Sequence, residues 1–298
     1  MPAIDGILSK ADAMHGILYT ELRLDFLITP VSPISIQARE TGQFVRAPHP
    51  YAAERSVYIP GGTLKGTLRH TTEHIVRRAG LACCTPDKRC ASGTFCPVCT
   101  LFGSSAIRGR MSVTDAFPLD PLGKLPVRDS DRRSRHVSSE TVVGEGFYGS
   151  LSIRNFERWQ VGLLAQIAAR LNLADIQIGG NRSLGMGQVL VRFRCLSLLY
   201  FGPGFDAPTE EQYRTTLHGA GELAGIGKGF VYPDAASLPD LPSEAMAQPG
   251  AGYLAIVITD DDPDVAHDQI DTALTTQAIA WGSYIRTGRQ AQTPFHSK

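Results

Sequence analysis

Hydrophobic residues recur at two spacings along this chain, and each spacing predicts a type of element. Residues 22–28 alternate between apolar and polar side chains, which is the period of a half-buried strand. Apolar positions in 64–79 fall at helical spacing, with Thr63 as a candidate N-cap and Gly80 as the stop. The whole pattern predicts strand 22–28, helix 64–79, strands 111–115 and 147–153, helix 159–171 and strand 189–194.

The order of these elements is β, α, β, β, α, β. This order is typical of the ferredoxin-like or RRM-like fold, so we expect an α+β protein. Long insertions interrupt the pattern at about residues 30–58, 83–99 and 118–146. We therefore predict a core over residues 1–200 and a C-terminal extension over 201–298 that packs on it. In the extension, the sequence predicts a strand at 253–259 and a helix at 269–285.

Composition excludes a membrane or disordered class. The chain has 298 residues, of which 43% are hydrophobic, enough to bury a full core. No apolar run approaches the roughly 20 residues of a membrane helix, and the first residues lack a secretory signal pattern. We expect a cytoplasmic protein with no membrane partner.

Charge is distributed unevenly although the formal net charge is zero. Six basic residues lie between Gly61 and Cys90, against Glu73 and Asp87. Thirteen acidic residues lie from Asp206 to Asp271, against two basic ones. Ordinary surface variation accounts for such a split in some proteins. The alternative is that different faces bind different partners, with nucleic acid at the basic part.

Two glycine-rich segments are candidates for phosphate binding. The first is Ile59-Pro-Gly-Gly-Thr-Leu-Lys-Gly-Thr-Leu-Arg69, where two glycines precede a helix start and free N–H groups could converge on an anion. The second is Ile178-Gly-Gly-Asn-Arg-Ser-Leu-Gly-Met-Gly187, between the second helix and the last strand. Neither has the spacing of a P-loop or a dinucleotide fingerprint. A plain turn remains an alternative for each.

Five of the six cysteines lie between residues 83 and 99. Clustered thiols in a reducing compartment favour Zn²⁺ over disulfides. The first-choice ligands are Cys84, Cys90, Cys96 and Cys99, with Cys83 or His74 as substitutes. We expect a structural site with four protein ligands, since no glutamate base adjoins a ligand as in hydrolytic zinc sites.

Arginines are concentrated in the third insertion, at residues 128–136. The segment is polar and has no periodicity, so it resembles a projecting arm that could lie along phosphates. A solvated loop is the alternative.

Four ordered motifs together resemble the RAMP superfamily of CRISPR proteins. They are residues 58–69, 96–104, 108–115 and 178–187, and the resemblance covers about residues 18–195. It is closest to the repeated backbone subunit of type III effector complexes, and type IV backbone subunits are also similar. In such a protein the insertion at 118–146 would be the thumb hairpin that interrupts the guide–target duplex.

The resemblance implies a protein that polymerises along guide RNA and leaves the bases free to pair. Its expected partners are the crRNA, a complementary target RNA or DNA, further copies of itself in a helical filament, and other CRISPR effector subunits. The expected RNA-binding residues are Gly61, Gly62, Thr63, Lys65, Arg69, Arg108, Arg132, Arg133, Arg135, Gly179, Gly180, Arg182 and Ser183.

Catalysis is where the sequence departs from the type III pattern. Those subunits cut target RNA with an aspartate that would align near residues 41–43, and residues 30–58 contain no aspartate. Glu40, Glu54 and His49 are the alternative catalytic groups there. We therefore expect no catalytic residues and a binding subunit. The alternatives are a target-RNA endoribonuclease and, without RNA, a zinc-dependent hydrolase.

Overall fold

A seven-stranded antiparallel sheet forms the centre of the molecule. The computed structural model describes residues 18–37, 44–50, 55–85, 90, 95–119, 127–130, 139–142, 146–173, 175–201, 213, 216–223, 241, 246–250 and 252–292. The strand order in the main sheet is β10-β11-β9-β1-β8-β4, with β5 pairing β8 beyond this path. These strands are β1 (Thr20–Pro30), β4 (Met111–Val113), β5 (Phe117–Pro118), β8 (Phe147–Arg154), β9 (Val189–Phe201), β10 (Met246–Gly250) and β11 (Tyr253–Thr259).

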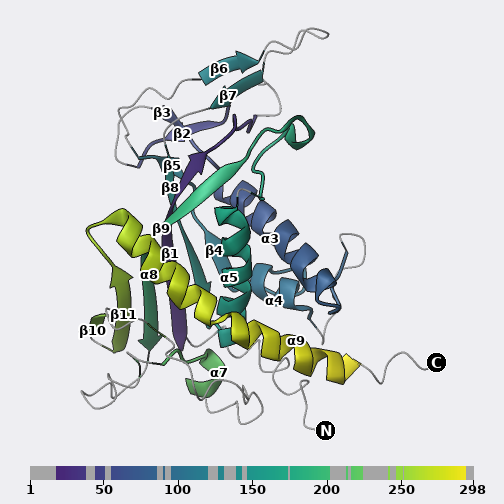
Figure 1. Cartoon of the computed structure of the whole chain (residues 1–298), viewed down its shortest axis with the longest axis vertical. Coiled ribbons are helices and arrows are strands. Elements are labelled where there is room, and N and C mark those ends of the chain that lie inside the picture. The colour runs from purple at the N-terminus through teal and green to yellow at the C-terminus, as the bar shows by residue number, and fades with distance from the viewer. Residues whose placement is uncertain are drawn as a thin grey trace, which may run out of the picture.

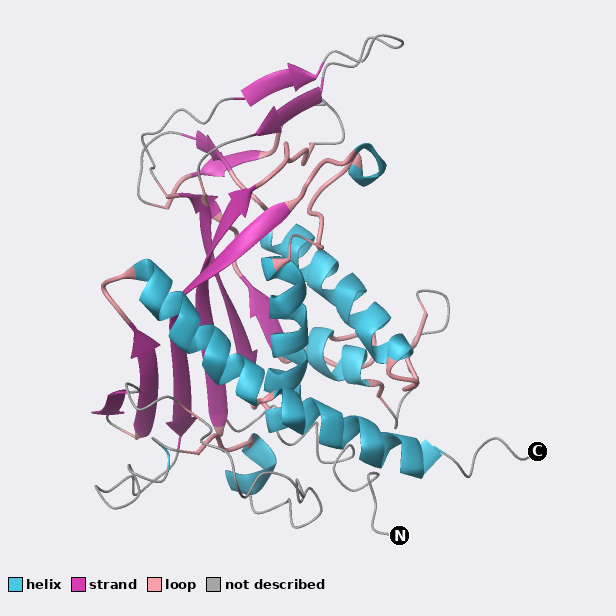
Figure 2. Cartoon of the chain, viewed as in Figure 1, coloured by secondary structure: helices cyan, strands magenta, loops and turns pink. Residues whose placement is uncertain are grey.

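Helices cover one face of this sheet (Figures 1 and 2). The alternating side chains of β1 explain the arrangement, because Leu22, Leu24, Phe26 and Ile28 are all buried in the core. Burying each such side chain contributes roughly 1.5–3 kcal/mol. The helices are α3 (Gly61–Arg78), α4 (Pro97–Phe102), α5 (Arg158–Asn172), α7 (Ala220–Leu223), α8 (Pro263–Thr276) and α9 (Ala278–Gln292).

The ferredoxin-like core predicted from the sequence is confirmed. Its strands β1, β4, β8 and β9 stand in the order β9-β1-β8-β4, and the helices α3 and α5 follow the first and third of them in the chain.

Two small hairpins are added, β2 (Arg46–Pro48) with β3 (Arg55–Val57), and β6 (Val127–Ser130) with β7 (Ser139–Val142). The β6–β7 hairpin belongs to the predicted thumb. It lies beyond the end of the sheet at which β9 begins, where Val142 bridges to Ile34 (Figure 1).

The C-terminal residues continue the same sheet. Strand β11 pairs with β9, and β10 pairs with β11. Helices α8 and α9 both pack on α5. The single helix expected at 269–285 is wrong, because the chain forms two helices with Gln277 as the C-cap of the first. The domain boundary near residue 200 stays a prediction.

No helix among the described residues is long and apolar enough to cross a membrane.

Candidate nucleic-acid interface and metal centre

A groove of about 520 Å³ separates helix α3 from the second glycine-rich segment. One face of the helix lines one side, the loop at 179–182 lines the other, and residues 35–37 complete the lining. The structure therefore brings together two segments that lie more than one hundred residues apart in the sequence. The residues contributed by the helix are Gly62, Thr63, Gly66, Thr67 and His70.

Two of the five helix residues that line the groove are glycines. Gly62 and Gly66 lie one turn apart, and a Cβ atom placed on either would meet nothing within 4 Å. A ligand backbone can thus approach the helix closely between the hydroxyl-bearing residues Thr63 and Thr67. Gly66 was not singled out from the sequence as a contact residue, although the spacing Gly62-x3-Gly66 places both glycines on one helical face.

Gly61 faces away from the groove and joins α3 to the sheet. Its N–H donates to the Asp115 carboxylate at 2.7 Å, and a Cβ atom there would lie 2.8 Å from the Thr114 carbonyl carbon. The expected N-cap at Thr63 is wrong, since the helix begins at Gly61 with Pro60 as its N-cap residue. The Asp115 carboxylate therefore lies at the positive, N-terminal end of the helix dipole. Because it accepts the Gly61 N–H, the helix start offers a ligand anion fewer free N–H groups than the sequence suggested.

The two cations of the first segment also point elsewhere. Lys65 Nζ donates to the Met111 carbonyl at 2.8 Å, and Arg69 Nη1 donates to the Gly103 carbonyl at 2.7 Å. Burial, followed by the charge of Arg69, lowers the pKa of the Lys65 ammonium. Neither residue is part of the groove lining. Their assignment as RNA contacts stays a prediction.

Backbone contacts hold the second segment in place. Gly179 has a positive φ of +91°, and the Gly180 N–H donates to the Ser35 carbonyl at 2.8 Å. The adjacent short 3-10 helix η1 (Arg182–Leu184) carries an exposed Arg182, which lines the groove. Ser183 is exposed at the same turn but is outside the lining.

The remaining sequence candidates are scattered. Arg108 is exposed on the turn before β4 and outside the groove lining. Arg132, Arg133 and Arg135 lie outside the described residues, as do Glu40, Glu54 and residues 41–43. His49 is buried, with its ring edge-on to Phe117 at a centroid distance of 5.2 Å, which makes it part of the packing rather than a surface group.

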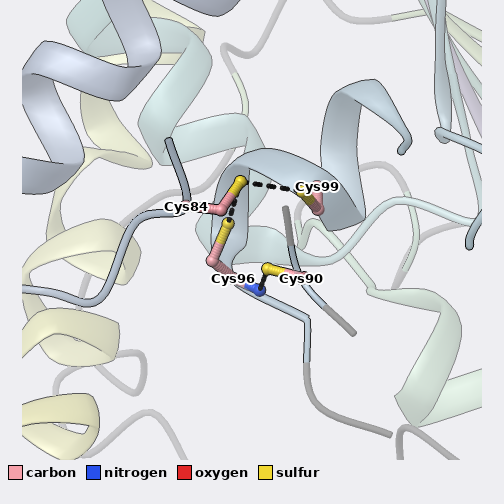
Figure 3. A group of neighbouring side chains, drawn as sticks. All are labelled: Cys84, Cys90, Cys96 and Cys99. Atoms are coloured by element: carbon pink, nitrogen blue, oxygen red, sulfur yellow. Dashed lines mark hydrogen bonds between the residues drawn. The ribbon is translucent and has the colours of Figure 1, made fainter. Parts of the chain in front are cut away.

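The cysteine cluster assembles as the first-choice set. The Sγ atoms of Cys84, Cys90, Cys96 and Cys99 all lie within 4.8 Å of one another (Figure 3). Cys84 Sγ is 3.2 Å from Cys99 Sγ and 3.7 Å from Cys96 Sγ. Tetrahedral zinc with bonds of about 2.3 Å separates its sulfurs by about 3.8 Å, so the four thiols are compatible with a zinc site. Of the substitutes, His74 pairs with His70 instead.

Local structure explains why these thiols converge. Cys96 is the N-cap residue of α4 and Cys99 lies in its first turn, so the CxxC pair shares one helix end. Burial raises the pKa of the Cys90 and Cys99 thiols, because a buried thiolate loses hydration. Hydrogen bonds from Cys83 and other neighbours lower the pKa of Cys96 to about 4. Such a cluster of thiols favours a soft divalent cation as its partner.

The cluster is linked to α3. Arg69 Nη2 lies 3.8 Å from Cys99 Sγ, while its Nε is 3.2 Å from Glu73 Oε1. Arg69 thus joins the helix that forms the groove wall to the short helix that carries two cysteines.

A family profile described as "RAMP superfamily" matches residues 28–190, more than half of the chain. The chain belongs to the RAMP superfamily. No curated protein sequence matches it. A solved chain titled "Type IV-B CRISPR Complex" is similar in structure, with 19% identity, a TM-score of 0.45, and coverage of 57% of this chain and 90% of that chain.

The RAMP match contains both walls of the groove and all four cysteines of the cluster. It ends before β10, β11, α8 and α9. These elements correspond to the C-terminal extension expected from the sequence, whose division from the core stays a prediction. Asp115, whose carboxylate accepts the Gly61 N–H at the start of α3, is a second residue, besides Gly66, that no sequence pattern indicated as part of this region, although it ends the motif at 108–115.

Proposed function

We propose that this RAMP protein is a guide-RNA-binding backbone subunit of a CRISPR effector complex. It coats the crRNA as a filament of identical copies, together with other effector subunits, and presents the bases to a complementary target. The observation that carries the proposal is the groove in which a glycine face of α3 meets the glycine loop at 179–182.

The chemistry of the groove suits a sugar–phosphate backbone. Gly62 and Gly66 leave room for close approach, Thr63 and Thr67 offer hydroxyl donors, and Arg182 offers a guanidinium that can bind phosphate. Contacts of this kind position a strand without reading its sequence. A guide-coating protein requires this property, because guides differ in sequence and their bases must stay available.

The cysteine cluster would hold a structural Zn²⁺ through Cys84, Cys90, Cys96 and Cys99. Four thiolate ligands would leave no open position for substrate, so zinc would supply stability and no Lewis-acid chemistry. Its effect on RNA binding would be indirect, through Arg69 and the placement of α3.

Holding the RNA without cutting it is the second part of the proposal. No carboxylate lies among the described residues that line the groove. The lack of an aspartate in residues 30–58 supports the same conclusion. A general acid–base pair or a Mg²⁺ site for strand cleavage would need carboxylates near the phosphate.

Binding of a labelled single-stranded RNA, measured by fluorescence anisotropy at several salt concentrations, tests the proposal. Arg182→Gln should weaken binding and reduce the slope of log K against log[salt] by about 0.7, the value for one phosphate contact on a single strand. Arg78→Gln is the matched control, since Arg78 is exposed at the other end of α3 and outside the groove lining. Equal slopes for the two variants would contradict the proposed groove.

A further inference from the structure

Two exposed histidines form a pair on helix α3 that the cysteine cluster does not use. His70 and His74 lie one turn apart, and their Nε2 atoms approach to 3.1 Å. The ring centroids are 4.5 Å apart and the planes are nearly perpendicular, at 86°. The rings therefore meet nitrogen to nitrogen at one point on the helix surface, where a hydrogen bond requires that one Nε2 be protonated and the other not.

The nitrogen spacing matches the bite of a chelated metal ion. Metal–nitrogen bonds of about 2.05 Å to atoms 3.1 Å apart enclose an angle of about 98° at the metal. This value lies between the octahedral angle of about 90° and the tetrahedral angle of about 109°, both of which imidazole ligands accept in d-block metal sites. A cation bound by both nitrogens would lie off the line that joins them, so the two exposed rings would turn to direct both Nε2 lone pairs at it.

Neighbouring groups leave this point accessible. Glu73, the adjacent carboxylate, bonds with Arg69 at 3.2 Å and with Arg77 at 3.4 Å, so its charge is already paired. His70 is also one of the residues that line the groove. The coordination positions that two imidazoles leave open therefore lie beside the groove, within reach of water or of an anionic oxygen.

We propose that His70 and His74 form a second metal site, a two-imidazole chelate for a divalent d-block cation at one end of the groove. The site is separate from the cysteine cluster in ligand type and in accessibility. Its open positions take a phosphate oxygen when a nucleic-acid strand fills the groove, so the cation adds positive charge to a wall that otherwise consists of glycine and threonine.

Isothermal titration of the zinc-loaded full chain with Ni²⁺ tests the metal site without any RNA. Zinc content measured after the titration shows whether Ni²⁺ has displaced zinc. We expect one additional ion per chain in the wild type. We expect affinity to fall by more than about tenfold in His70→Gln and in His74→Gln, since loss of even an outer-shell partner typically costs 10–100-fold.

Arg78→Gln on the same helix is the control and should bind Ni²⁺ as the wild type does. Both histidines are exposed, and circular dichroism of each variant shows whether its fold is intact. The absence of a wild-type Ni²⁺ site, or equal Ni²⁺ affinity in the histidine variants, overturns the proposal.

The phosphate contact rests on the proposed function and has its own readout. At constant ionic strength, Ni²⁺ should tighten binding of single-stranded RNA by the wild type and leave His74→Gln unchanged. Equal tightening in both proteins would overturn the phosphate contact. If Ni²⁺ binds as expected and the wild type shows no RNA binding at all, the metal site stands and the proposed function fails.

Discussion

Two glycines in the first turns of α3, Gly61 and Gly66, have different surroundings, and these surroundings predict opposite effects of adding a methyl group. A Cβ atom at Gly61 would lie 2.8 Å from the Thr114 carbonyl carbon and closer still to the Val113 carbonyl oxygen. A Cβ atom at Gly66 would meet nothing within 4 Å. Gly61 lets the helix touch the sheet, whereas Gly66 keeps the groove face bare.

The expected magnitudes follow from these contacts. Gly66→Ala improves helix propensity at an exposed position, which stabilises the protein by roughly 0.8–1.0 kcal/mol. Gly61→Ala forces the helix away from backbone atoms that cannot rotate aside, which costs about 1–3 kcal/mol as overpacking. Displacement of Gly61 also strains its hydrogen bond to Asp115, which adds to the loss.

Urea unfolding followed by circular dichroism measures both effects. The midpoint should rise for Gly66→Ala and fall for Gly61→Ala, with similar slopes, because a change of midpoint at constant slope reports stability. A rise in both variants would refute the contact between Gly61 and the strand β4. A fall in Gly66→Ala would refute the open surroundings of the groove face.

Three other predictions concern the metal, pH and catalysis. After dialysis that removes metal from the exposed histidine pair, elemental analysis should find one zinc per chain. Cys99→Ser should lose this zinc and unfold at lower urea; zinc-free wild type of unchanged stability would argue against the site. Burial lowers the pKa of His267, whose Nδ1 accepts the Phe193 N–H at 3.1 Å, so folding favours the neutral ring. Above about pH 6.5 the free energy of unfolding should therefore not depend on the titration of His267, and below about pH 6.5 it should decrease as pH falls. The decrease should be smaller in His267→Gln; the same pH profile of stability in both proteins would show that His267 does not cause it. Complementary labelled RNA incubated with the RNA-loaded protein and Mg²⁺ should remain intact on a denaturing gel, and regular fragments would instead support the endoribonuclease.

The sequence predicted those features that depend on local patterns. The alternation of apolar and polar side chains in residues 22–28 was sufficient to predict β1, because successive side chains of a strand with one buried face point alternately into the core and away from it. The CxxC spacing was sufficient to predict that two thiols of the cysteine cluster lie together, because both fall on one helix end. The order of elements was sufficient for the ferredoxin-like core, since few topologies accept it.

Features that depend on distant residues were missed. The start of α3 is set by Asp115, more than fifty residues further along the chain, so local capping rules pointed to Thr63 instead. The directions of Lys65 and Arg69 depend on the carbonyl groups of Met111 and Gly103, which no helical pattern reveals.

The close approach of the α8–α9 break to α5 also depends on a distant residue. A Cβ atom on Gly162 of α5 would collide with the Gln277 backbone at this break. The break and the start of α9 can therefore lie close to α5 because Gly162 of α5 has no side chain. A continuous amphipathic pattern in residues 269–285 carried no sign of it.

Single-stranded RNA affinity of Gly66→Glu tests the central claim most directly. The substitution places a negative side chain inside the groove, where space is open and the fold tolerates it. Thr272→Glu is the control, since Thr272 is exposed on α8 and the charge change is the same. We predict that Gly66→Glu weakens RNA binding by at least about tenfold, because juxtaposed like charges cost several kcal/mol, while Thr272→Glu binds like the wild type. Equal affinity of the two variants would show that RNA does not occupy this groove.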